Sequence, residues 1–197
     1  IAEAARLYGD GHMMMTTRLT IEVSGIAYHD IDAFCAHLAK AGLSVGGTGS
    51  KVRPVVSCKA TTCQYGLYDA YALSDEIHTR FYQGYRGVSL PHKFKIATGG
   101  CPNNCVKPTL NDLGIVGARV PQYHIEDCRS CKKCQLEEAC PIHAAKKNAD
   151  GKLEIDAELC NHCGRCIGKC PFHCNDEGVD GYKVYVGGRW GKKIAHG

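Results

Sequence analysis

Cysteine spacing constrains this chain more than any other feature. The chain has fourteen cysteines in 197 residues, and twelve of them lie in short motifs. Two of these motifs each contain three cysteines with two residues between neighbours, and each ends in Cys-Pro. They are CRSCKKCQLEEACP (128–141) and CNHCGRCIGKCP (160–171). This spacing wraps thiolates around one cube of iron and sulfide. Disulfide scaffolds, the main alternative, are typically short and secreted, so the spacing favours iron–sulfur clusters.

The two runs together predict a bacterial-type ferredoxin module with two [4Fe–4S] clusters. In such ferredoxins the fourth cysteine of each run binds the cluster of the other run. Applied here, this crossing gives a Cys128 set (Cys128, Cys131, Cys134 and Cys170) and a Cys160 set (Cys160, Cys163, Cys166 and Cys140). The first run has five residues rather than three before its last cysteine. A zinc site is the alternative for the same spacing.

Composition describes an ordinary globular protein, with 44% hydrophobic and 22% charged residues. No apolar run reaches the ~20 residues of a membrane span, and oxygen-sensitive clusters lead us to expect a reducing cytoplasm. Residues 122–179 contain 8 Lys/Arg against 10 Asp/Glu, whereas the rest of the chain contains 16 against 10. No Lys/Arg stripe indicates nucleic-acid binding, so we expect the basic part to bind a smaller polyanion.

Hydrophobic periodicity predicts an alternation of helices and strands. We expect helices at 1–8, 31–41 and 67–82, and strands at 12–23, 52–56, 93–98, 112–120 and 182–188. The last two strands bracket both cysteine runs. We therefore predict an α+β catalytic domain formed by residues 1–121 and 180–197, with a ferredoxin domain inserted at 122–179.

Four further cysteines lie in VVSCKATTCQYGLYD and ATGGCPNNCVKPTLND, and we call them the Cys58 set (Cys58, Cys63, Cys101 and Cys105). Together with TTR (16–18), VRPVVSC (52–58), LPHKFK (90–95) and VGG (186–188), these motifs resemble the sirohaem-dependent sulfite and nitrite reductases. With the inserted module, the resemblance is to the anaerobic and dissimilatory sulfite reductases. One departure is that four residues separate Cys58 from Cys63, where many members have five.

The resemblance implies the fold, the cofactors and the site. The fold would be one sirohaem/[4Fe–4S] half-domain of that family. The Cys58 set would hold a third [4Fe–4S] cluster, with Cys105 bridging it to the iron of sirohaem. The residues that bind the substrate anion would be Arg18, Arg53, Lys93 and Lys95, and Thr16, Thr17, Asn103 and Asn104 would help to bind the cofactor.

These residue types suit a reaction on sulfite. The anion must be held by fixed positive charge, and each departing oxygen needs a proton donor. Lys93 and Lys95 are two apart on a predicted strand, so they point to the same face. Plant-type nitrite reductases carry Asn in place of the second lysine, so Lys95 favours sulfite over nitrite.

The expected function is the six-electron reduction of sulfite to sulfide. The alternatives are nitrite reduction to ammonia by the same centre and a non-catalytic electron-transfer protein. No G-x-G-x-x-G fingerprint is present, so an external ferredoxin or flavoprotein would supply electrons. Because each motif occurs once, we expect a homodimer or higher oligomer that shares the sirohaem site. Outside the three sets, Cys35 is expected to be a buried hydrophobe and Cys174 a free thiol.

Overall fold

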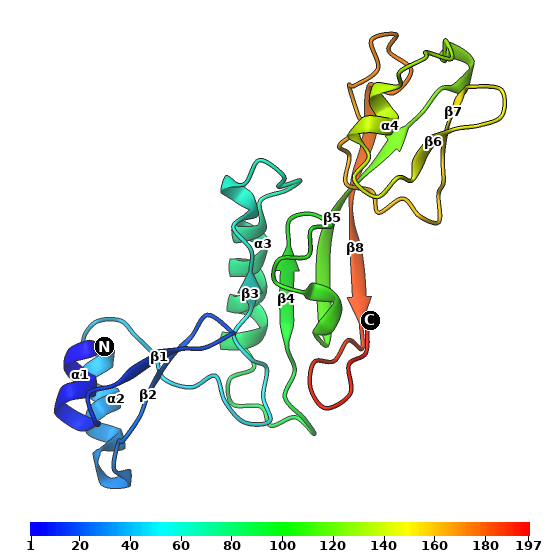
Figure 1. Cartoon of the computed structure of the whole chain (residues 1–197). Helices are drawn as coiled ribbons and strands as arrows, with labels where there is room; N and C mark the ends of the chain where they lie inside the picture. Colours follow the sequence, from blue (N-terminus) through cyan, green and yellow to red (C-terminus); the bar gives the residue numbers. More distant parts are fainter. The chain divides into compact units, whose positions relative to one another are not determined.

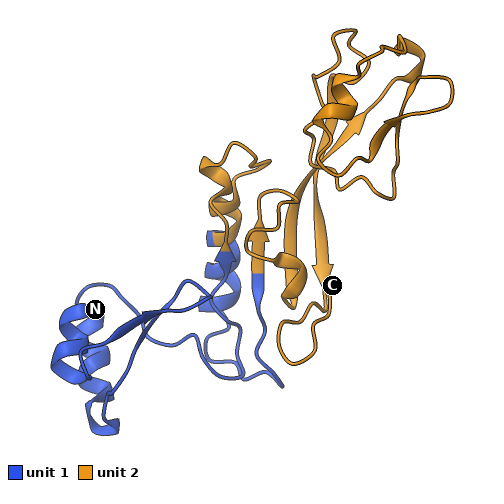
Figure 2. Cartoon of the chain, in the orientation of Figure 1, with its two compact units in different colours: residues 1–56, 75–96 blue, residues 57–74, 97–197 orange.

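The computed structural model describes all 197 residues, which form two compact units (Figures 1 and 2). Unit 1 contains residues 1–56 and 75–96, and unit 2 contains residues 57–74 and 97–197. The division follows packing and differs from the expected domain boundaries at 121/122 and 179/180. None of the helices has the length and apolar content needed to cross a membrane.

Unit 1 has a small helical core. Helix α1 (Ala2–Tyr8) and helix α2 (Ile31–Ala39) form where the periodicity predicts them. Phe34 and Leu38, one turn apart on α2, are buried against Ala4 of α1, and Cys35 is partly buried at the edge of this core. The i, i+4 spacing places both α2 side chains on one face, which explains why these two helices were predictable.

The single strand predicted at 12–23 is wrong. The segment is a hairpin in which β1 (Met13–Met15) pairs antiparallel with β2 (Ile21–Val23). At its turn the Thr16 N–H donates to the Thr20 carbonyl at 2.9 Å, the two hydroxyls lie 2.6 Å apart, and Leu19 has a φ of 59°. Threonine hydroxyls close the turn without Gly, Pro or Asn, so the sequence carried no turn signal.

A four-stranded sheet with the order β3-β4-β5-β8 is the main scaffold. Its strands are β3 (Val56–Ser57), β4 (Ile96–Gly99), β5 (Leu113–Gln122) and β8 (Glu177–Val186). The predicted strand at 52–56 is reduced to β3 and to an isolated parallel bridge between Val52 and Phe94. Helix α3 (Ala70–Ile77) continues as a π-helix (His78–Gln83) within the predicted 67–82 helix.

Strands β5 and β8 form a long antiparallel ribbon that runs from Leu113↔Val186 to Gln122↔Glu177 (Figure 1). The ribbon therefore includes four residues, 122 and 177–179, that the sequence assigned to the inserted segment. Residues 123–176, between the two strands, form α4 (Gln135–Ala139) and a hairpin of β6 (Ala145–Lys147) and β7 (Leu153–Ile155). Short 3-10 helices complete the chain at Tyr28–Asp30, Ala60–Thr62, Pro108–Leu110 and Ile125–Asp127.

The segment between β5 and β8 has its own core. Leu136, Ala145, Leu153 and Cys174 are buried at its centre, and five cysteines of the Cys128 and Cys160 sets pack around them. Four buried side chains are few for a segment of this size, so the apolar core supplies only part of its stability.

Candidate functional site

The Cys58 set follows the ends of two neighbouring strands of unit 2. Cys58 comes directly after β3, where its N–H donates to the Thr98 carbonyl of β4 at 3.1 Å. Cys101 and Cys105 follow β4 on one loop, and Cys63 ends the Ala60–Thr62 turn. Neighbouring strands of one sheet thus deliver the cysteines of this set.

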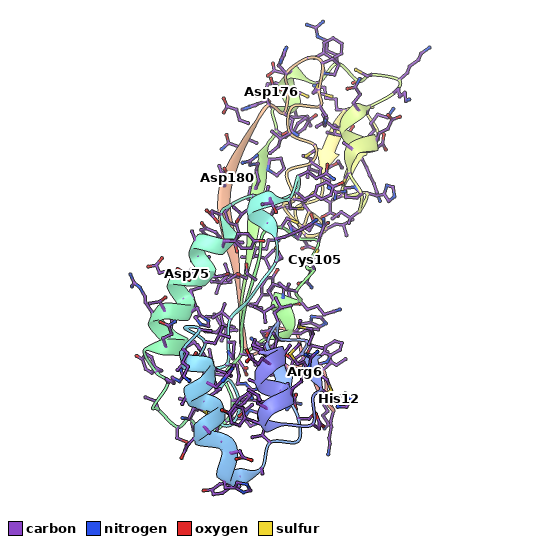
Figure 3. All side chains as sticks on the ribbon, turned by 90° about the vertical axis from the view of Figure 1, so that its left-hand side faces the viewer. Arg6, His12, Asp75, Cys105, Asp176 and Asp180 are labelled. Carbon is purple, nitrogen blue, oxygen red and sulfur yellow. The ribbon has the colours of Figure 1, made fainter.

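Electrostatic interactions link the Cys101 thiol to the other three cysteines of this set. Burial raises the pKa of Cys101, and the Asn103 N–H opposes this rise. The negative charges of Cys105, Cys58 and Cys63 add to the increase. Cys105 is the exposed member of the set, on the loop after β4 (Figure 3).

Gly99 and Gly100 are required by close packing in this region. The Gly100 N–H donates to the sulfur of Cys58 at 3.1 Å. A Cβ on Gly100 would lie 1.9 Å from the Cβ of Ala60, and one on Gly99 would lie 2.9 Å from Cγ of Pro108. Neither position has room for a side chain, so the backbone N–H can approach the sulfur directly.

The structure places the other eight predicted ligands around two cavities. Every sulfur of the Cys128 set lines one cavity, and every sulfur of the Cys160 set lines the other. Cys170 therefore lies with the first run and Cys140 with the second, which is the grouping that crossed ligation requires; the ligation itself stays a prediction. All fourteen cysteines are free thiols. No three His, Cys, Asp or Glu side chains are placed to hold a single metal ion.

Polar hydrogens surround the sulfurs of these cavities. The Ala144 N–H donates to Cys140 at 3.2 Å, and the Leu153 N–H donates to Cys128 at 3.5 Å. Burial tends to raise the pKa of Cys128, but the Tyr123 hydroxyl and the Leu153 N–H lower it overall. Such donors stabilise negative charge on sulfur, so the donor sets fit iron–sulfur clusters.

Strand β5 connects the Cys58 set with the Cys160 set. A Cβ on Gly117 would lie 2.5 Å from the Gly100 carbonyl oxygen, and the Arg119 N–H donates to the His162 carbonyl at 2.8 Å. Arg119 is held in place by an ion pair to Asp180 on β8; Asp180 is labelled in Figure 3. Two residues of a strand span about 7 Å, so the two sets lie along one short stretch of β5.

A second contact joins the same two sets. The guanidinium of Arg165 lies 4.3 Å from the centre of the Tyr65 ring. Arg165 lies between Cys163 and Cys166, and Tyr65 is two residues after Cys63. Both contacts involve the Cys160 set, so this set is the neighbour of the Cys58 set.

The four predicted anion-binding residues all belong to unit 1. Nη2 of Arg18 donates to the carbonyl oxygens of Pro54 at 2.7 Å and Ile96 at 3.0 Å. Pro54 follows Arg53, and Ile96 follows Lys95. These bonds hold the Arg18 guanidinium next to the two segments that carry the other basic residues.

Those two segments are paired in parallel. The Arg53 N–H donates to the Phe94 carbonyl at 2.8 Å, and Val52 bridges Phe94. Because side chains alternate along an extended chain, we expect Arg53, Lys93 and Lys95 to emerge on the face opposite Val52 and Phe94. Nε of Arg53 is buried without a hydrogen-bond partner. An open, buried cationic donor on this face fits the binding of an anion.

The predicted cofactor-binding residues differ in whether their polar atoms are already hydrogen-bonded within the chain. The Thr16 hydroxyl is engaged in the β1–β2 turn, whereas Thr17 and Asn103 are exposed. Asn104, at a φ of 57°, donates from Nδ2 to Thr109 at 3.2 Å, and its buried Oδ1 has no hydrogen-bond partner. Asn104 therefore keeps one buried polar atom for a ligand.

The sequence analysis missed two polar residues beside the cysteine cavities. Tyr123, at the start of the segment between β5 and β8, has its hydroxyl near Cys128, and burial first and Cys128 second raise its pKa. Asn175 is fully buried, and its side chain interacts with Cys166. Neither residue lies inside a cysteine motif, so no local pattern identified them.

Comparisons with known proteins agree with this site. A family model described as the nitrite and sulphite reductase 4Fe-4S domain matches residues 48–197. The coenzyme F420-dependent sulfite reductase of Methanocaldococcus jannaschii is 34% identical over 184 residues, which cover 93% of this chain and 28% of that protein. One subunit of the anaerobic sulfite reductase of Salmonella typhimurium is 31% identical over 179 residues, which cover 79% of this chain and 49% of that protein.

A solved structure supports the same fold. The crystal structure of dissimilatory sulfite reductase I matches with a TM-score of 0.67 at 22% identity, over 95% of this chain and 49% of that one. This chain spans less than half the length of each of these three proteins. The matched family model covers most of the chain, including all twelve cysteines of the three sets. The chain therefore belongs to the nitrite and sulphite reductase 4Fe-4S domain family, as its cysteine motifs indicate.

Proposed function

We propose that this chain is a sirohaem-dependent sulfite reductase that reduces sulfite to sulfide with six electrons. The observation that carries the proposal is the delivery of the Cys58 set by two neighbouring strands, β3 and β4, with the Gly100 N–H bonded to the sulfur of Cys58. The sulfite reductases among its relatives support the choice of substrate.

The Cys58 set would hold one [4Fe–4S] cluster. Cys105 suits the position shared with sirohaem because it is the exposed sulfur of the set. When bound, the coupled cluster and sirohaem supply electrons to the sulfur of sulfite. Asn103, Asn104, Thr16 and Thr17 would bind the carboxylates of sirohaem through their amide N–H and hydroxyl donors, whereas the open Oδ1 of Asn104 is an acceptor and would take a donor such as water.

The segment 122–179 would be a ferredoxin domain inserted between β5 and β8. Its two clusters would be held by the Cys128 set and the Cys160 set, which line separate cavities. The Cys160 set is the one that contacts the surroundings of the Cys58 set through Arg119 and Arg165. We therefore assign the Cys160 set to the inner end of an electron relay and the Cys128 set to its outer end.

Arg18, Arg53, Lys93 and Lys95 would bind the sulfite anion and supply protons. The two arginines hold oxygen atoms in a fixed geometry, and Arg53 has an open buried Nε. A lysine ammonium can release a proton to a departing oxygen, which leaves as water. Lys93 and Lys95 emerge on the same face as Arg53, so positive charge and protons would be supplied together.

The active assembly would contain two copies of this chain. All four basic residues belong to unit 1 and all twelve cysteines of the three sets belong to unit 2. We propose that the basic residues of one copy face the sirohaem bound through Cys105 of the other. A closed twofold pair is the commonest arrangement of this kind.

The cofactor content tests the proposal first. Purified under anaerobic conditions, the protein should contain about 13 iron atoms per chain, four in each of three clusters and one in sirohaem. It should also show the chlorin absorption bands of sirohaem. Iron and sulfide without chlorin absorption would instead favour an electron-transfer protein.

Turnover then tests the substrate. With a low-potential electron donor, sulfite should be consumed with release of sulfide at a higher kcat/KM than nitrite is reduced to ammonia. A clear preference for nitrite would contradict the assignment based on Lys95.

A further inference from the structure

Two consecutive residues near the end of the segment between β5 and β8 are buried. Cys174 is 1% exposed and Asn175 is fully buried. The backbone of both is fixed, because the Cys174 carbonyl accepts from the His124 N–H at 2.9 Å and the Asn175 carbonyl accepts from the Gly168 N–H at 2.8 Å. Their side chains are thus held in one arrangement.

Cys174 reaches the Cys128 set. Its thiol donates to the sulfur of Cys170 at 3.0 Å, and it lines the same cavity as that set. Leu136, Ala145 and Leu153 form the apolar core around Cys174 and hold its side chain against the cavity. Cys174 therefore acts as a hydrogen-bond donor to a predicted cluster ligand, beyond the role of a free thiol expected from the sequence.

Asn175 reaches the Cys160 set. Neither Nδ2 nor Oδ1 of its amide makes a hydrogen bond of normal geometry, although both atoms are buried. Its backbone carbonyl accepts from Gly168, two residues after Cys166, so Asn175 lies against the loop that carries this cysteine. Burying an unpaired amide is costly, and a cluster bound through Cys166 would give its N–H groups a partner.

We propose that Cys174 and Asn175 are a pair of hydrogen-bond donors that set the reduction potentials of the two clusters, Cys174 for the Cys128 set and Asn175 for the Cys160 set. A reduced cluster carries more negative charge on its sulfur atoms than an oxidised one. A donor to a ligand sulfur therefore stabilises the reduced form and raises the potential. Because each residue acts on one cluster, the pair sets the difference in potential between the two ends of the relay. The inference rests on the proposed function, since it requires both clusters.

The test is a redox titration of the full-length protein, followed by electron paramagnetic resonance. The variants are Cys174→Ala and Asn175→Leu, which remove one donor each with little change in volume. Each variant should keep the iron and sulfide content of the wild type. In each variant the reduction potential of one cluster should be lower than in the wild type. The two variants should affect different clusters. Asp176→Glu, at the exposed next residue (Figure 3), keeps the negative charge and is the matched control, which should leave both potentials unchanged.

Cys174→Ser distinguishes a donor from a packing residue. Its hydroxyl keeps a donor at the same position, so its potential should lie between those of the wild type and Cys174→Ala. If Cys174→Ala and Asn175→Leu both keep their clusters and titrate as the wild type does, the proposal is wrong. Loss of one cluster in Cys174→Ala and in Cys174→Ser would make Cys174 a ligand and overturn its role as donor. A wild-type protein without the two clusters would instead refute the proposed function, which the iron and sulfide analysis reports separately.

Discussion

The Gly100 N–H donates a hydrogen bond to the sulfur of Cys58 at 3.1 Å. The bond links the end of β4 to the residue after β3, and it forms because Gly100 has no side chain to keep the two strands' ends apart. A backbone donor at this distance stabilises a thiolate that binds iron.

Replacing Gly100 with Ala should lower the stability of the fold and weaken iron binding by the Cys58 set. The added Cβ would lie 1.9 Å from the Cβ of Ala60, so the backbone must shift and the hydrogen bond to Cys58 is lost. Overpacking of this kind costs about 1–3 kcal/mol. Thermal unfolding should show a lower Tm, and iron per chain should fall. Gly181→Ala on β8, where a Cβ meets no atom within 4 Å, is the control; equal effects of both variants would contradict this explanation.

Lys93→Ala and Lys95→Ala should each lower sulfite turnover far more than they lower cofactor content. Loss of one charged donor at comparable sites reduces the rate by about 10²–10³. Steady-state kinetics and the chlorin spectrum of each variant check this expectation. Lys40→Ala, at another exposed lysine of unit 1, is the control and should remain active. Near-normal rates in both test variants would remove these lysines from the anion site.

Cys163→Ser should impair turnover that depends on a protein electron donor while sirohaem stays bound. The reason is that the Cys160 set neighbours the Cys58 set through Arg119 and Arg165. The measurement compares sulfite reduction by the protein donor with the chlorin absorption of the same sample. Cys35→Ser, on α2 of unit 1, is the matched control. Unchanged donor-driven activity after loss of that cluster would refute the relay.

A mixture of inactive Lys95→Ala and Cys105→Ser chains should regain activity in part of the mixed dimers. In such a dimer one of the two sites is intact. The Cys105→Ser chain supplies its basic residues, and the Lys95→Ala chain supplies its Cys58 set. Co-expression with two affinity tags isolates the mixed dimers for assay. A fully active monomer at high dilution would refute the shared site, and so would inactive mixed dimers.

The sequence determined the grouping of the cysteines and the strands that carry them. The three cysteines that each run gives to one cube are separated by two residues, and such local spacing is fully visible in a sequence. The crossed sets proposed for Cys140 and Cys170 follow the pattern of two-cluster ferredoxins, and the structure groups these cysteines in the same way. Helices α1 and α2 and strands β5 and β8 were predictable because their burial is periodic.

Only the tertiary structure decided the relationships between residues far apart in the chain. The hairpin at 13–23 depends on hydroxyl contacts in its turn, and Arg18 is fixed by carbonyl groups 36 and 78 residues away. The partners of Cys174 and Asn175 are likewise set by burial. Whether a thiol or an amide in the interior is a donor to a sulfur depends on which atoms surround it. That environment is built by the packing of β5, β8 and the segment between them, which no short stretch of sequence encodes.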